Sequence, residues 1–160
     1  MINKVTLLST LIISASYFGG QVQAAEDASL TLTKAEEYSA GPEKYFTGDV
    51  EVGSFFNSKL DDYKGAIVNF TAGAYTNWHT HPRGQTLVIT DGEGRAQSEG
   101  DDIQVLKPGD TVWIPANVRH WHGAAPDSAM SHIAIQSPDE NGNVVNWMEK
   151  VDPAVYASGK

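Results

Sequence analysis

The sequence predicts an all-β fold, arranged as a sandwich or barrel of short strands. From residue 50 onward, short runs rich in β-branched and aromatic residues follow one another at regular spacing, which is typical of sandwiches and barrels. Turn-forming residues separate these runs, as at Asp91-Gly92, Glu99-Gly100 and Pro108-Gly109-Asp110. The 160 residues contain no internal repeat, and the length suits one domain with its own hydrophobic core.

Each expected strand covers one apolar or alternating run between turn residues. The expected strands are residues 50–56, 65–70, 76–80, 85–90, 95–98, 103–106, 111–114, 120–123 and 130–136. Near the end of the chain, Asp152 and Pro153 predict a short helix that runs through Tyr156, because aspartate favours the N-cap and proline the first helical position. Because aromatic residues dominate cores, three tryptophans are expected to pack at the sheet interface: Trp78, Trp113 and Trp121.

The first 24 residues have the three parts of a secretory signal peptide. Lys4 lies near the start, an apolar run covers residues 5–18, and Val22-Gln23-Ala24 provides small residues for cleavage. The run is shorter than the roughly 20 residues that a membrane span needs, so the mature protein is expected to be periplasmic or secreted, with no membrane anchor. The expected division is a signal peptide at residues 1–24, an N-terminal arm at 25–47 and a barrel domain at 48–160.

Composition excludes several classes of function. The formal net charge is −9, and an acidic surface repels nucleic acid. The chain contains no cysteine, which excludes thiolate metal ligands, a cysteine nucleophile and disulfides. A small molecule is therefore the expected partner.

The most informative feature is a pair of histidines one residue apart, His79 and His81. In a strand, alternate side chains share one face, so both rings point the same way. Gln85 follows, and His120 begins a His-Trp-His run that ends at His122. Imidazole suits first-row transition metals, and three imidazoles with one amide oxygen leave a coordination position for water or substrate. A lone His-x-His pair also occurs by chance, but this set predicts a metal site at His79, His81, Gln85 and His120, with His122 as a pocket histidine rather than a further ligand.

The run at residues 130–136 can be phased in two ways. One phase places His132, Ala134 and Gln136 on the inner face and Ile133 and Ile135 outside, which gives a polar and roomy wall. The other phase buries the two isoleucines and exposes His132. The pattern alone leaves both phases open.

Residues 65–70 also alternate. Ala66, Val68 and Phe70 share one face, with Ile67 and Asn69 on the other. The first set predicts a mostly apolar lining for a substrate pocket.

The sequence around the histidines resembles the two motifs of the cupin family. Gly73, His79, His81, Gln85 and Gly92 stand at the spacing of the first motif, and the segment 109–120 resembles the second. This resemblance implies a jelly-roll barrel, the cupin double-stranded β-helix, with the short helix at its C-terminal end.

Two positions depart from these cupin motifs. Glutamate is usual where this chain has Gln85, and glycine is frequent where it has Asn117, although asparagine tolerates a left-handed turn. The neutral glutamine leaves more positive charge on the ion, which favours Lewis-acid chemistry over oxygen chemistry.

Several segments carry a closer resemblance, to the small bacterial cupins that act as (R)-selective hydroxynitrile lyases: residues 78–82, 84–87, 120–124, 129–136 and 146–149. The resemblance implies a metal-dependent lyase with acid/base chemistry on a small cyanohydrin or carbonyl substrate. It implies manganese at the four metal ligands named above, His132 as the acid/base, and Ala66 and Val68 in the substrate cavity. The expected catalytic set is His132, with Gln136 and His122 beside it.

Two other functions are compatible with the same residues. One is a metal-dependent dioxygenase or oxidative carbon–carbon cleaving cupin, and the other is a non-catalytic periplasmic cupin that binds a small molecule. Iron, nickel or zinc are alternatives to manganese, because a shell of histidine and glutamine accepts several divalent ions. A homodimer or homotetramer is expected.

Overall fold

The computed structural model describes residues 30, 32, 34, 37–60 and 62–158. The chain divides into two compact units, residues 1–32 and 33–160, and the described elements all belong to the second unit. The expected signal peptide lies outside the described residues. Within the described part of the chain, no helix is long and apolar enough to cross a membrane.

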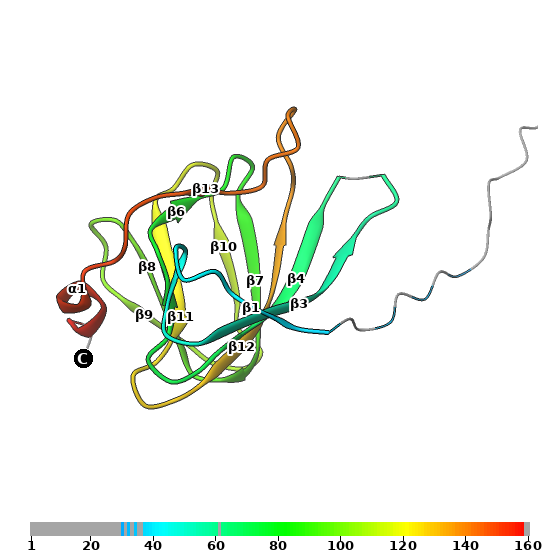
Figure 1. Ribbon diagram of the computed structural model, residues 1–160. Helices are drawn as coiled ribbons and strands as arrows, with labels where there is room; N and C mark the ends of the chain where they lie inside the picture. The colour runs from blue at the N-terminus through cyan, green and yellow to red at the C-terminus, as the bar shows by residue number, and fades with distance from the viewer. Residues whose placement is uncertain (1–29, 31, 33, 35–36, 61, 159–160) are drawn as a thin grey trace, which may run out of the picture. The chain divides into compact units, whose positions relative to one another are not determined.

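One antiparallel sheet contains six of the described strands, in the spatial order β1-β3-β4-β12-β7-β10 (Figure 1). Its strands are β1 (Ser39–Ala40), β3 (Val50–Asn57), β4 (Lys64–Phe70), β12 (Met130–Gln136), β7 (Gln85–Gly92) and β10 (Thr111–Ile114). Because β12 lies between β4 and β7, three segments far apart in the sequence share one surface.

The second antiparallel sheet follows the order β13-β6-β11-β5-β2, and β8 extends it by pairing with β11 and β9. Its described strands are β13 (Asn146–Trp147), β6 (His79–Thr80), β11 (His120–Ala124), β5 (Tyr75–Thr76), β2 (Phe46–Thr47), β8 (Gly94–Ser98) and β9 (Gln104–Leu106). Strand β11 lies centrally and contacts β5, β6 and β8.

The all-β prediction is confirmed, with two differences in the strands. The strand expected at residues 76–80 is interrupted, because the backbone N–H of Asn77 donates to Tyr45 (2.8 Å) and that of Trp78 to Glu149 (3.1 Å) instead of to one partner strand. The sequence pattern also missed β1, β2 and β13. Each of these has two residues, too few for an alternating pattern to be visible.

The short C-terminal helix is also confirmed. Helix α1 (Pro153–Ala157) begins after Asp152, whose carboxylate accepts from the N–H of Ala154 at 2.8 Å. The helix buries Tyr156, whose hydroxyl donates to the carbonyl of Ala124 at 2.8 Å. This contact attaches the helix to the end of β11.

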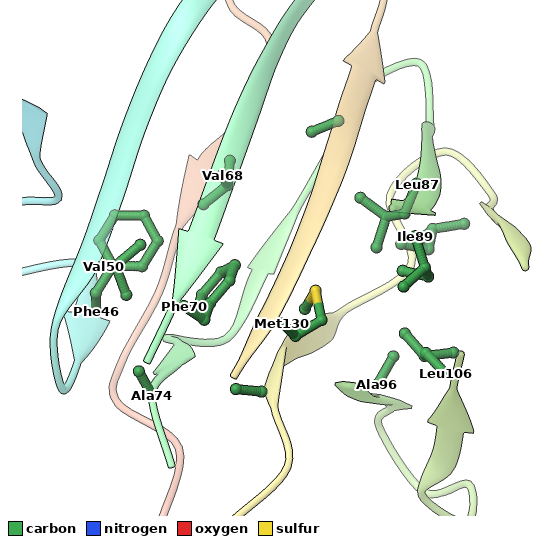
Figure 2. Packing of buried hydrophobic residues seen from close by; sticks show 13 residues of the cluster. Phe46, Val50, Val68, Phe70, Ala74, Leu87, Ile89, Ala96, Leu106 and Met130 are labelled. Atoms are coloured by element: carbon green, nitrogen blue, oxygen red, sulfur yellow. The ribbon is translucent and has the colours of Figure 1, made fainter. Parts of the chain in front are cut away.

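The main core lies between the two sheets. Figure 2 shows Phe70, Met130, Leu87 and Ile89, from three different strands, packed in one buried layer. A second cluster contains Tyr75, Trp78, Trp121, Val151 and Tyr156. Together the two clusters fix the central strands that hold the histidines.

Two of the three tryptophans expected in the core are buried there, and one is not. Trp78 and Trp121 belong to the second cluster, but Trp113 lies on the edge strand β10 and is 61% exposed. Its ring covers Gly84, where a Cβ would come within 2.5 Å of it. Trp113 therefore covers a turn instead of filling the core.

The phase of β12 is settled in favour of an inward His132. His132 and Ala134 are buried, at 0% and 6% exposure, whereas Ile133 and Ile135 are half-buried on the opposite face. On β4, the residues Ala66, Val68 and Phe70 are all buried on the inner side. The inward residues of β12 and the apolar inward residues of β4 therefore face the same interior.

Candidate metal centre

Register pairing brings the expected ligands into one region. His79 on β6 is the direct partner of His120 on β11. In the other sheet, Gln85 on β7 is the direct partner of Gln136 on β12. Each sheet therefore contributes one facing pair of site residues, and the loop after β6 adds His81.

The three expected histidine ligands lie close together and are almost completely buried. The ring centroids of His79 and His120 are 4.1 Å apart, those of His79 and His81 are 5.1 Å apart, and those of His81 and His120 are 5.5 Å apart. Their exposure is between 1% and 3%. Among the described residues, the group of ring nitrogens that lie within 4.8 Å of one another contains His79 and His120 but not His81.

Backbone carbonyls fix the protonation of all three rings. The Nδ1 atoms of His79, His81 and His120 contact the carbonyl oxygens of residues 77, 144 and 118 at 3.0, 2.6 and 2.9 Å. A carbonyl only accepts hydrogen bonds, so each Nδ1 carries the hydrogen and each Nε2 keeps a lone pair. Metal-binding histidines are characteristically held in this way.

Three atoms here, which we call the open donor atoms, have no hydrogen-bond partner among the described residues: His81 Nε2, His120 Nε2 and Gln85 Oε1. The amide of Gln85 is oriented by its Nε2, which donates to Gln136 Oε1 at 3.2 Å. Leaving a buried polar atom unpaired costs free energy. A bound divalent ion that reached these atoms would satisfy them, so the chemistry of the donor set suits a divalent metal.

The turns around His81 hold its backbone. Its carbonyl accepts from the N–H of Asn117 at 2.9 Å and from the N–H of Gly84 at 3.3 Å. Asn117 has φ 61°, which confirms the left-handed turn expected for an asparagine at this position.

His122 lies closer to the metal centre than the sequence argument placed it. One ring nitrogen from each of His79, His120 and His122 lies within 4.8 Å of the others, so these three rings could hold a divalent ion. However, the Nδ1 of His122 has no hydrogen-bond partner within the described chain, so no backbone carbonyl fixes this ring. Its ring lies 5.0 Å from that of His132.

Burial lowers the pKa of every histidine at the site. It lowers the pKa of His120 to about 4, against the opposing effect of the hydrogen bond to the Val118 carbonyl, and it lowers the pKa of His132 to about 4 as well. Burial also lowers the pKa of His81, partly offset by the hydrogen bond to the carbonyl of Val144. Burial, followed by neighbouring histidines, holds the pKa of His79 and His122 well below its usual value. All five rings are therefore neutral at pH 7 and can act as ligands or as proton acceptors.

A cavity of about 150 Å³ opens beside the metal centre. The residues that the sequence placed in the pocket or the catalytic set all line it: Ala66, Val68, Phe70, His122, His132 and Gln136. Three expected metal ligands also line it: His79, His81 and Gln85. A larger hollow of about 800 Å³ elsewhere includes none of the histidines. His120 lines a separate hollow of about 250 Å³, so the cavity of about 150 Å³ is the one that gathers most of the candidate site residues.

His132 is the buried acid/base candidate within this cavity. The side chain is 0% exposed, and neither Nδ1 nor Nε2 has a hydrogen-bond partner in the described part of the structure. Its ring packs against Phe70, with centroids 5.6 Å apart. A neutral imidazole with open nitrogens at a cavity wall can exchange a proton with a bound molecule.

Other residues that line the cavity were not among the expected site residues. Phe55 lines the cavity although its position in β3 alternates with the inward residues, and Val145 and Trp147 come from the short strand β13 and the residue before it. Trp147 is fixed by stacking on Tyr45, with centroids 4.6 Å apart. Contacts between segments this far apart are not visible as a local pattern.

An antiparallel two-sheet fold with a histidine cluster on its inner face is the architecture of the cupins. A family model for the cupin domain matches residues 66–135. Over 117 residues the chain is 47% identical to a protein from Granulicella tundricola named (R)-mandelonitrile lyase, and the alignment covers 72% of this chain and 88% of that one. The chain therefore belongs to the cupin family.

Solved structures share this architecture. A cupin-like protein from Thermotoga maritima superposes with a TM-score of 0.71 at 38% identity, covering 78% of this chain and 94% of that one. A cupin-2 domain from Rhodospirillum rubrum gives a TM-score of 0.60 at 18% identity, covering 82% of this chain and 91% of that one. The second likeness concerns the fold alone.

Proposed function

We propose that this cupin is a metal-dependent lyase that uses acid/base chemistry on a small cyanohydrin or a related carbonyl compound. One observation carries the proposal. His81 and Gln85, each with an open donor atom, line a small, mostly apolar cavity that also contains the unpaired imidazole of His132. The ring of His120 lies 4.1 Å from that of His79, which lines the same cavity.

The proposed ligands are His79, His81, Gln85 and His120, and manganese is the first candidate for the ion. A bound divalent ion supplies positive charge that stabilises an oxygen or cyanide group as negative charge develops on it. All four donors are neutral, so they leave that charge undiminished. Gln136 accepts a hydrogen bond from Nε2 of the Gln85 amide, so the amide oxygen of Gln85 points away from Gln136.

His132 moves the proton in this proposal. Burial holds its pKa at about 4, so the ring is neutral at pH 7 and can accept the proton of a cyanohydrin hydroxyl. The bond between the carbinol carbon and the cyanide carbon then breaks, and its electron pair leaves with cyanide. Because His132 is a weak base, it readily returns the proton to cyanide, which gives an aldehyde and hydrogen cyanide.

The size of the cavity supports a small substrate. A cavity of about 150 Å³ is of the order that holds one benzene-sized ring. The walls from β4 are apolar, and His122, His132 and Gln136 supply the polar groups. The relative from Granulicella tundricola, named for its action on mandelonitrile, adds support for a substrate of this size.

The proposal is tested by measuring cyanohydrin cleavage and oxygen uptake on the same preparation. We expect mandelonitrile to be cleaved at the same rate with and without oxygen, with activity lost on chelation and restored by Mn²⁺. Elemental analysis of protein purified without a histidine tag identifies the ion. Oxygen consumption with a phenolic substrate and no mandelonitrile cleavage would instead identify an oxygenase, and ligand binding without turnover would identify a binding protein.

A further inference from the structure

The alternation of β3 is broken by a β-bulge beside the cavity. Before the break, Gly53 pairs with Ile67, and after it Phe56 pairs with Gly65. Three steps along β3 therefore match two steps along β4. One extra residue in a strand is the defining property of a bulge, and bulges near functional sites turn side chains to the other face.

The bulge changes the direction of two adjacent phenylalanines. Ile67 and Gly65 are two residues apart on β4 and share its outer face, so Phe56, the partner of Gly65, also lies on that face. Its ring covers Gly65, where an added Cβ would lie 2.2 Å from the ring. In a regular strand, Phe55 would take this place opposite Gly65. The extra residue instead turns Phe55 to the inner side, where it lines the cavity with Val52.

Phe55 differs from the other apolar residues of the cavity in its exposure. Its side chain is 57% exposed, whereas Ala66, Val68 and Phe70 are at most 8% exposed. Phe55 therefore lies at the mouth, with much of its ring in water. Covering an exposed aromatic ring with an apolar group is favourable, so a ligand that reaches the mouth gains affinity from this contact.

Trp147 forms one wall of the cavity mouth, and its ring is held by neighbouring rings. It lines the same cavity, stacks on Tyr45, and lies with its ring centroid 4.8 Å from that of His79. Phe55 belongs instead to the β3–β4 hairpin (Figure 1), at a part of β3 that lies beyond the residues paired with β1, Glu51 and Val52. The ring of Phe55 is thus the part of the mouth with room to adjust to a ligand.

We propose that Phe55, turned inward by the β3 bulge, is a specificity-determining residue that packs on the apolar group of the substrate at the cavity mouth. The identity of that substrate rests on the function proposed above. The contact with Phe55 does not depend on that function, because any ligand that carries an apolar group beside a polar group could make it.

The test compares Phe55→Ala with Tyr63→Ala in metal-loaded protein. Tyr63 is a matched control, because it is an aromatic residue of the same hairpin that is 41% exposed and does not line the cavity. Binding of benzyl alcohol, an unreactive aromatic alcohol, is measured by ligand-observed NMR. We expect Phe55→Ala to weaken this binding about tenfold, as for the loss of one aromatic contact with its buried area, and Phe55→Leu to recover most of it.

Steady-state kinetics give a second readout. Phe55→Ala is expected to raise the KM ratio of mandelonitrile to acetone cyanohydrin about tenfold, because the smaller substrate offers no ring to the mouth. Tyr63→Ala should leave this ratio as in the wild type. Metal content and thermal unfolding midpoint are measured for each variant, so that loss of the fold or of the ion is distinguished from loss of the contact.

The outcomes separate this inference from the proposed function. If the protein cleaves no cyanohydrin, the benzyl alcohol titrations still decide the role of Phe55. Equal benzyl alcohol affinity in Phe55→Ala and wild type overturns the inference, even where lyase activity is present. A Phe55→Ala variant that changes the molecular mass in solution but not the affinity also overturns it, since the ring would then belong to a contact between copies.

Discussion

Gln85 and Gln136 face each other across neighbouring strands, and Gln85 Nε2 donates to Gln136 Oε1 at 3.2 Å. The hydrogen bond occupies the nitrogen side of the Gln85 amide and leaves Oε1 as one of the open donor atoms. Gln136 therefore acts on the proposed ion through Gln85, as a positioning residue as well as part of the cavity wall.

Removing the acceptor at Gln136 should weaken metal binding. In Gln136→Ala the amide of Gln85 loses its hydrogen bond, and loss of such a supporting contact typically costs about 10- to 100-fold in metal affinity. Competition with a chelator of known affinity measures the effect. Gln136→Glu keeps an oxygen for Gln85 Nε2 and should retain the ion. If Gln136→Ala binds Mn²⁺ as tightly as the wild type, the orienting role is excluded.

Truncating His132 should abolish most turnover without releasing the metal. A positioned acid/base contributes about 100- to 10,000-fold, so we expect His132→Ala to lose mandelonitrile cleavage by a factor in this range. Turnover is compared at equal manganese content, determined by elemental analysis. Undiminished turnover at matched metal would remove His132 from the mechanism.

Substitution of His81 and of His122 should have opposite effects on metal content. The ring of His81 is held by the carbonyl of Val144 with its Nε2 open, whereas no carbonyl among the described residues fixes His122. We expect His81→Ala to release the ion and His122→Ala to retain it but to turn over more slowly. Manganese stoichiometry after dialysis decides between them. The reverse pattern would support a site made of His79, His120 and His122, whose nitrogens are also within reach of one ion.

The metal-free protein should lose stability in acid. His120 and His132 stay neutral in the folded chain down to about pH 4, whereas in the unfolded chain each takes up a proton near the ordinary histidine pKa of 6.5. The free energy of unfolding should therefore be unaffected by these groups above pH 6.5, fall as the pH drops from 6.5 to 4, and level off below. Each histidine contributes a slope of about 1.4 kcal/mol per pH unit.

Urea unfolding at several pH values between 7.5 and 4.5 measures this slope. His132→Asn removes one of the histidines that titrate in this range, so its slope should be lower by about 1.4 kcal/mol per pH unit. A wild-type free energy of unfolding that does not change between pH 6.5 and 5 would show that these histidines are not buried as neutral groups.

The histidine-rich region could be located from the sequence because it depends on alternation and spacing. The group of rings within reach of one ion, however, includes His122, which was expected only as a pocket residue, and not His81. His79 and His81 share a face for purely local reasons, and the inward face of β4 follows from the same alternation. The sequence of β12 could not show which of its faces is buried, since either His132 or the two isoleucines could point inward. Packing between the sheets makes that choice.

The features that sequence reasoning missed depend on contacts between distant segments. The carbonyl that holds His81 belongs to Val144, 63 residues later. The inward turn of Phe55 arises from one extra residue relative to β4, which no pattern within β3 reveals. Alternation already places His122 on the same face as His120, but its closeness to His79 depends on how β11 lies against β6, a contact between distant segments.

The carbonyl contacts of the rings of His79, His81 and His120 have a practical consequence for loading the protein. Because hydrogen bonds within the polypeptide already set the tautomer of each ring, the site does not depend on an ion for its assembly. Apoprotein prepared by chelation should stay folded at neutral pH and accept Mn²⁺, Fe²⁺, Ni²⁺ or Zn²⁺ in separate reconstitutions. The choice of ion then becomes a variable that the experimenter sets, and the reactivity of one scaffold can be compared from metal to metal.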